Sequence, residues 1–268
     1  MKVIRFLNRV LTRLEIVLLA AAIIYSGFAL WDNHLVYNQV ENGMREMREI
    51  KTLNGEEPLS LFDQLRSINP DVTAWLKMDG TSIDYPVLKG KSNYSYLNTD
   101  VYGDFAMAGS IYMDFRNSRD YSDSYTLLLG HDMSGHRMFS DINLYKKEEF
   151  FRENTRGILT LPDGDHELLS LSVIVTGASN ALIFNPQNWK NLTAEEILEA
   201  VHQEALWLNE DGIRILESML ASESGAHIVA LSTCSSEYSN ARTILLTVID
   251  PVRVKIYMPV KQAGDCFD

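Results

Sequence analysis

The sequence is poor in cysteine, has an excess of acidic over basic residues, and lacks several common catalytic motifs. Only Cys234 and Cys266 occur, which excludes a disulfide scaffold and a cysteine-rich zinc or iron–sulfur site. The net charge is −12, so the basic surface that nucleic acids require is absent and we expect no nucleic-acid partner. There is no Gly-x-Ser-x-Gly elbow, no glycine-rich phosphate loop and no His-Glu-x-x-His motif. His131 and His136 have the wrong spacing for one helical face and no obvious third ligand, so no metal site is expected.

The remaining composition is that of an ordinary folded chain. Of the 268 residues, 46% are apolar, 10% are aromatic and 22% are charged. These values exclude disorder, a collagen-like repeat or a coiled coil as the main state. The length suits one large domain or two small ones.

The N-terminal segment differs from this average. Residues 1–15 carry four basic side chains and one acidic one, and Ile16–Trp31 then contains sixteen residues without a charge. This run is slightly short of the ~20 residues that span a bilayer and longer than the ~7–15 of a signal peptide. We therefore predict an uncleaved signal anchor, with a cleaved signal peptide as the alternative. Because basic residues stay on the cytoplasmic side, the N-terminus is predicted inside and the chain after residue 35 on the extracellular face.

The exported part begins with helical patterning and continues with β-rich patterning. Apolar side chains recur at helical spacing over residues 36–65, with a break at Asn54–Pro58, although a plain linker would also fit. Asp79-Gly80 and a later Pro-Asp-Gly each predict a hairpin. About eight strands are expected, and strand patterning covers nine segments, namely Ala74–Met78, Ser82–Leu88, Ser110–Asp114, Thr126–Gly130, Gly157–Leu161, Glu167–Thr176, His227–Ser232, Thr243–Ile249 and Val252–Tyr257.

Two helical insertions interrupt the strands. One covers Phe139–Phe151, and the other covers Thr193–Leu220. The second insertion begins with a capping box formed by Thr193 and Glu196, and it is divided into two helices at Asn209–Gly212. Because the strands occur in clusters, the pattern predicts a mostly β barrel with inserted helices rather than alternating βαβ units.

Three residues of different chemistry lie at the ends of apolar strands. Cys234 ends IVALSTC, His131 follows TLLLG, and Arg242 begins the strand that continues with TILLTVI. A short loop between Cys234 and Arg242 can return the guanidinium to the thiol, so a nucleophile, an acid/base and a fixed cation could converge. Taken alone, such a cysteine is most often a small buried hydrophobe and such a histidine a loop residue. The joint pattern is much more specific, and a chain outside the membrane with two cysteines favours a thiol kept for chemistry.

The sequence resembles the class B sortases. The similar stretches are TAWLKMDGTSIDYPVLKG, SNYSYLNTD, GSIYMD, TLLLGHDMSGHRMFSDINLY and LSTCSSEYSNARTILL, which cover residues 70–150 and 227–257 together with the anchored N-terminus. The resemblance implies a sortase β-barrel of seven to eight strands with an N-terminal helical extension. Residues 1–35 would form the cytoplasmic tip and the transmembrane helix, residues 36–68 the extension, and residues 69–268 the catalytic barrel.

The resemblance also implies the site and the reaction. His131, Cys234 and Arg242 match the catalytic positions, and Asn93, Leu97, Ser232 and Thr233 match a substrate groove. The segment Ala178–Phe184, with Ile183, would form the opposite wall. The loop SSEYSNA departs from the family, because it lacks the acid that some members carry two residues after the cysteine.

The implied activity is cysteine transpeptidation of the kind found in Gram-positive bacteria. A secreted protein with a C-terminal sorting motif is cut through a thioester, and its new carboxyl is joined to an amine of peptidoglycan or of a pilin. No metal or organic cofactor is required. A membrane-tethered cysteine protease and a non-catalytic wall-associated binding module are the alternative interpretations.

Overall fold

The computed structural model describes residues 2–54, 58–222, 225–237 and 239–255. The prediction for Cys266 and the end of the strand expected at Val252–Tyr257 lie outside these residues. The chain forms two units, residues 1–43 and residues 44–268, and each is described by itself.

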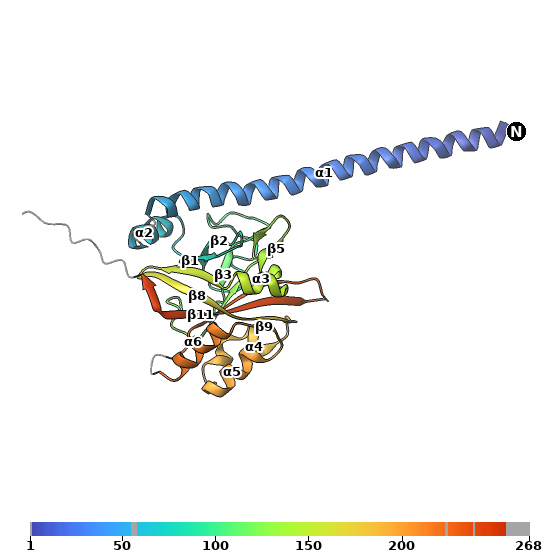
Figure 1. Ribbon diagram of the computed structural model, residues 1–268. Helices are drawn as coiled ribbons and strands as arrows, with labels where there is room; N and C mark the ends of the chain where they lie inside the picture. Colours follow the sequence, from blue (N-terminus) through green and yellow to red (C-terminus); the bar gives the residue numbers. More distant parts are fainter. Residues whose placement is uncertain (1, 55–57, 223–224, 238, 256–268) are drawn as a thin grey trace, which may run out of the picture. The chain divides into compact units, whose positions relative to one another are not determined.

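The second unit is dominated by strands (Figure 1). Its helices after the N-terminal α1 (Lys2–Asn54) are α2 (Pro58–Ile68), η1 (Ser140–Lys146), α3 (Glu148–Glu153), α4 (Ala181–Phe184), η2 (Pro186–Trp189), α5 (Ala194–His202) and α6 (Glu210–Leu220). Its strands are β1 (Val72–Met78), β2 (Asp84–Leu88), β3 (Ile111–Met113), β4 (Tyr125–Leu129), β5 (Asp132–Met133), β6 (Arg137–Met138), β7 (Arg156–Leu161), β8 (Gly164–Gly177), β9 (Ala205–Leu208), β10 (Ile228–Cys234) and β11 (Ala241–Lys255).

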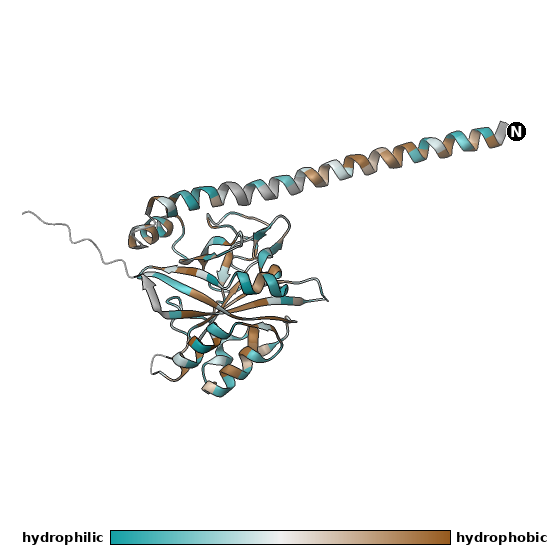
Figure 2. Ribbon diagram, viewed as in Figure 1, coloured by the Kyte–Doolittle hydropathy of each residue, from teal (hydrophilic) through white to brown (hydrophobic). Residues whose placement is uncertain are grey.

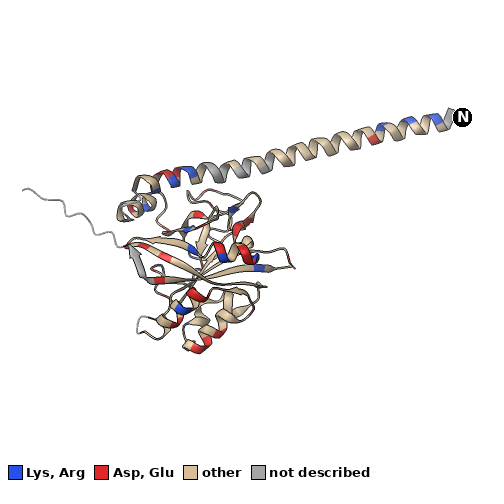
Figure 3. Ribbon diagram, in the orientation of Figure 1, with Lys and Arg blue, Asp and Glu red and all other residues tan. Residues whose placement is uncertain are grey.

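Eight of these strands close into a barrel. The sheet runs β11-β10-β4-β3-β2-β1-β7-β8-β9, and β11 also pairs antiparallel with β8, which closes the ring and leaves β9 as an extra strand on β8. The strands carry few charged residues, whereas Lys, Arg, Asp and Glu gather on helices and loops (Figure 3). The predicted mostly β barrel with inserted helices is therefore confirmed.

Both predicted hairpins form. β1 and β2 pair antiparallel around Asp79-Gly80, where Gly80 has φ +69°, a left-handed value that an L side chain rarely adopts. β7 and β8 pair antiparallel across Leu161–Gly164. Turn chemistry within a few residues is enough to specify these two pairings.

Three predicted boundaries were wrong. The two strands expected at Thr243–Ile249 and Val252–Tyr257 are one strand, β11, whose pairing with β8 shifts register between Ile249 and Val254. The segment Thr193–Leu220 contains β9 between its two helices, because this strand extends the edge of β8. The helix expected at Phe139–Phe151 is a 3₁₀ helix, η1, followed by α3. The capping box of Thr193 and Glu196 is present as predicted.

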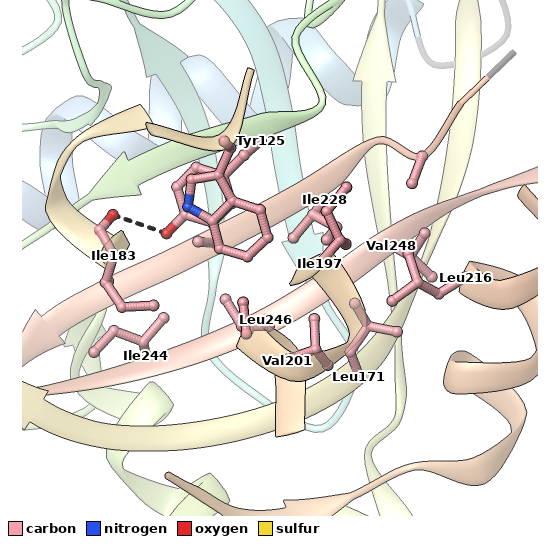
Figure 4. Packing of buried hydrophobic residues seen from close by; sticks show 14 of the residues in the cluster. Tyr125, Leu171, Ile183, Ile197, Val201, Leu216, Ile228, Ile244, Leu246 and Val248 are labelled. Atoms are coloured by element: carbon pink, nitrogen blue, oxygen red, sulfur yellow. Dashed lines mark hydrogen bonds between the residues drawn. The ribbon is translucent and has the colours of Figure 1, made fainter. Parts of the chain in front are cut away.

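Helices α5 and α6 cover one face of the barrel and bury an apolar cluster against it (Figure 4). Ile197 and Val201 of α5 and Leu216 of α6 pack with Leu246 and other side chains of β8, β10 and β11. Each such side chain contributes about 1.5–3 kcal/mol when fully buried. α6 approaches β8 closely, since a Cβ at Gly212 would lie 2.4 Å from the Ser170 carbonyl oxygen.

The first unit contains the apolar part of α1. Residues Ile4–Trp31 form a 28-residue stretch that includes the uncharged run Ile16–Trp31 and whose most apolar window has no buried residue, and its apolar bands are visible in Figure 2. By length and composition this stretch is a candidate membrane span. α1 ends at Asn54 and α2 begins at Pro58, which agrees with the break predicted there.

Candidate active site

The parallel pairing of β4 with β10 aligns the segments that carry the histidine and the cysteine. The last pair of the ladder is Leu129 with Ser232, and His131 and Cys234 each follow two residues later. Two further hydrogen bonds hold the strand ends together. The Gly130 amide donates to the Ser232 carbonyl at 3.2 Å, and the Thr233 hydroxyl donates to the Gly130 carbonyl at 3.1 Å. The same register, continued by two residues, would set the imidazole opposite the thiol.

The antiparallel pairing of β10 with β11 aligns Arg242 with Cys234. Cys234 and Arg242 are direct register partners, so their side chains lie on the same face of the sheet. The Cys234 residue is exposed, and the Arg242 guanidinium donates to the Ala241 carbonyl at 2.9 Å. A histidine, a cysteine and an arginine therefore lie at the ends of three neighbouring strands: His131 two residues beyond β4, Cys234 at the end of β10 and Arg242 near the start of β11.

The ring of His131 is held by one hydrogen bond. Its Nε2 lies 2.8 Å from the Leu97 carbonyl oxygen, which can only accept. Nε2 therefore carries the proton of the neutral ring, and Nδ1 is the atom that can accept or release one. The carbonyl of His131 accepts from the Phe139 amide at 3.0 Å, which closes the loop that contains β5 and β6.

The pKa of Tyr112 on β3 depends on burial and on charged groups of this site. Burial raises the pKa of its phenol to about 12; the negative charges of Asp114 and Cys234 also raise it, and the positive charge of Arg242 lowers it. Tyr112 is 7% exposed. A neutral phenol thus lies within electrostatic range of both the thiol and the guanidinium.

An ion pair on a buried carboxylate lies beside the site, within the loop that follows β3. The side chain of Asp114 is only 1% exposed and accepts two hydrogen bonds from the Arg116 guanidinium, at 2.8 and 2.7 Å. Asn93 donates to the same carboxylate at 2.7 Å. Burial opposes ionisation of Asp114, but the hydrogen bonds from Arg116 and Asn93 outweigh it and lower its pKa. Arg116 also donates to the Phe184 carbonyl at 2.6 Å, which ties this network to α4.

The side chains predicted to bind substrate have unequal access to solvent. Asn93 is committed to Asp114 and to the Phe115 amide, and Leu97 holds His131 through its carbonyl. Ser232 and Thr233 are each 1% exposed, and Ile183 is 2% exposed within the apolar cluster. The side chains of Ser232, Thr233 and Ile183 are therefore buried, so a bound peptide would contact these residues through their backbone atoms.

Sequence reasoning missed two residues at this end of the barrel. Tyr112 lay within a short apolar run that predicts a strand and no chemistry. Asn143 of η1 donates to the carbonyl of Cys234 at 3.1 Å, and an isolated asparagine in a helical segment carries no signal in the sequence. Among the described residues, no group of three or more His, Cys, Asp or Glu side chains could hold a metal ion.

The chain is similar to known class B sortases along most of its length. It is 25% identical to sortase B of Staphylococcus aureus over 256 residues, which cover 92% of this chain and 99% of that one. A Streptococcus pyogenes class B sortase involved in pilus biogenesis is 32% identical, with a TM-score of 0.62 over 70% of this chain and 97% of that chain. No family model matches.

Two solved complexes of sortase B are also similar. The Staphylococcus aureus enzyme with its substrate has a TM-score of 0.66 at 25% identity and covers 80% of this chain and 95% of that chain. A sortase B complex with triglycine has a TM-score of 0.64 at 25% identity and covers 80% of this chain and 96% of that chain.

Proposed function

The chain belongs to the class B sortases, which are cysteine transpeptidases, and on this premise we propose that His131, Cys234 and Arg242 carry its activity. The observation that supports this assignment most is the shared register of β4, β10 and β11, which aligns the three strand ends.

The proposed reaction has two acyl transfers. The Cys234 thiolate attacks a peptide carbonyl, and the resulting oxyanion is stabilised by Arg242; such a donor contributes about 3–4 kcal/mol in acyl transfer. The proton that Cys234 loses is taken up at Nδ1 of His131, and the resulting imidazolium gives it to the leaving amine, so that a thioester and a free amine result. An incoming amine then attacks the thioester, His131 takes its proton, and the thiolate leaves.

The proposed substrate is a secreted protein with a C-terminal sorting motif, and the proposed acceptor is an amine of peptidoglycan or of a pilin. Sortase B has been solved with substrate and with triglycine, which supports a peptide donor and an amine acceptor. Asn93 and Leu97 would contribute one wall of the groove, Ile183 the other, and Ser232 and Thr233 its floor. Their committed or buried side chains favour recognition through the peptide backbone.

The proposed location is the extracellular face of a membrane. Residues 1–35 would be the cytoplasmic tip and single-pass anchor, residues 36–68 a helical connection, and residues 69–268 the catalytic domain. The 28-residue candidate span of α1 supports an anchor, and the four basic residues before the uncharged run Ile16–Trp31 support an inside N-terminus.

Incubation of purified residues 35–268 with a peptide library and triglycine tests the proposal. Mass analysis of the product ends should find peptides with triglycine joined to a new carboxyl, and Cys234→Ala should produce none. Products that end only in a free carboxyl would indicate a protease, and peptide binding without cleavage would indicate a binding module. Either result would overturn the proposed reaction.

A further inference from the structure

The polar face of η1 bridges the three strand ends of the candidate active site. The Asn143 side-chain amide donates to the Cys234 carbonyl at 3.1 Å and to the Asp132 carboxylate at 3.2 Å. Its oxygen accepts from the Thr243 hydroxyl at 2.6 Å. Asp132 directly follows His131, and Thr243 directly follows Arg242. One amide is therefore bonded to the cysteine itself and to a direct neighbour of each of the other two residues.

The bonding capacity of this amide determines its orientation. Both hydrogens face groups that only accept, a carboxylate and a carbonyl, and the oxygen faces a hydroxyl that can donate. Thr243 is fully buried, so its hydroxyl has no access to water as a substitute partner. A flipped amide would bring its oxygen against the two acceptors.

A second contact from η1 supports the same bridge. Lys146 donates to the Ser235 hydroxyl at 3.2 Å and forms an ion pair with Glu237, so η1 also holds the first residues after Cys234. The carbonyl of Lys146 accepts from the Trp207 indole at 3.0 Å, which anchors η1 to β9. The helix that carries Asn143 is thus fixed to the barrel on both sides of the cysteine.

We propose that Asn143 is a positioning residue for transpeptidation, which aligns the histidine loop with the end of the cysteine strand. The proposal rests on the assignment of Cys234 as nucleophile and His131 as acid/base. It predicts an effect on the chemical step, because small displacements of reacting groups lower the rate by as much as about a hundredfold. Substrate affinity should change little, because the bonds of Asn143 are to the enzyme's own groups.

Three variants test this role. Asn143→Leu removes all the bonds at similar size, and Asn143→Asp keeps the acceptor for Thr243 but turns an oxygen toward Asp132 and Cys234. Both should lower kcat between about tenfold and a hundredfold, with KM within about twofold. Thr243→Val removes only the hydroxyl that orients the amide and should cause a smaller loss of kcat. If either Asn143 variant fails to fold, the kcat of Thr243→Val tests the positioning role instead.

A matched control is available on the same barrel. Asn117 also donates to a carboxylate and a strand carbonyl, those of Asp123 and Tyr125, and accepts from the Leu127 amide, but it lies by the start of β4, away from His131. Asn117→Asp should reduce stability and leave kcat per folded enzyme within about twofold.

Three results would overturn the positioning role. The first is a normal kcat per folded enzyme in the Asn143 variants, or in Thr243→Val if those do not fold. The second is a kcat loss in Asn117→Asp as large as theirs. The third is a raised KM at constant kcat. Failure of the proposed function is distinguishable, because the wild type itself would then form no product joined to triglycine, whereas failure of the positioning role alone leaves that product formed by the wild type and by the Asn143 variants.

Discussion

Replacement of Arg116 by alanine should destabilise the barrel through the carboxylate that it leaves behind. Asp114 has a side chain that is 1% exposed, and it would lose the two guanidinium bonds while keeping those from Asn93 and from the backbone amide of residue 116. Removal of one partner of a buried ion pair costs about 3–5 kcal/mol. Because half of the donors remain, we expect the lower end, about 3 kcal/mol. For a unit of this size that corresponds to a decrease of about 6–12 °C in Tm.

The pH dependence provides an independent check of the cause. The pKa of Asp114 is lowered in the folded protein, so its stabilising effect is present above its unfolded pKa of about 4 and is lost as the pH falls through the folded value. In Arg116→Ala the same carboxylate is poorly paired and gains more from protonation. The difference in unfolding free energy between wild type and variant should therefore shrink as the pH is lowered from 7 toward 4.

Urea denaturation at several pH values measures both quantities. Arg152→Ala serves as control, since its pair with Glu148 is exposed on α3 and should contribute about 0.5 kcal/mol or less. A loss below about 1 kcal/mol for Arg116→Ala, or a loss that does not depend on pH, would refute the reasoning.

Three further predictions concern the catalytic site, the tail and the membrane. Arg242→Lys and Arg242→Ala should each reduce peptide cleavage by at least about a hundredfold with little change in thermal unfolding, because a planar oxyanion donor is lost; near-normal cleavage by the lysine variant would remove Arg242 from the site. Cys266→Ser should leave transpeptidation within about twofold, and a large loss would mean that the tail contributes to activity. Protease added to intact protoplasts should degrade residues after 35 and spare a small N-terminal fragment, whereas full protection would contradict the orientation.

The family was identified from short local patterns. Strand ends with histidine, cysteine and arginine can be read from a few neighbouring residues each, and the two hairpins follow from the turn residues between their strands. The continuous β11 and the edge strand β9 were not predicted, because each depends on pairing with β8. Strand propensity reflects such neighbours more than the strand's own residues.

The sequence by itself determined the apolar N-terminal helix, the turns at Asp79-Gly80 and Pro162–Gly164, the capping box at Thr193 and the three catalytic candidates. The turns and the capping box depend on residues within about one helical turn or one hairpin loop, and the helix and each catalytic candidate are read from a contiguous run of the chain. Only the tertiary structure decided the parallel register of β4 with β10, the closure of β11 on β8, and the contacts of Arg116 and Asn143. These join residues that are distant in sequence, and they are selected by the apolar surface that the closed barrel buries and by the polar groups that burial forces to pair.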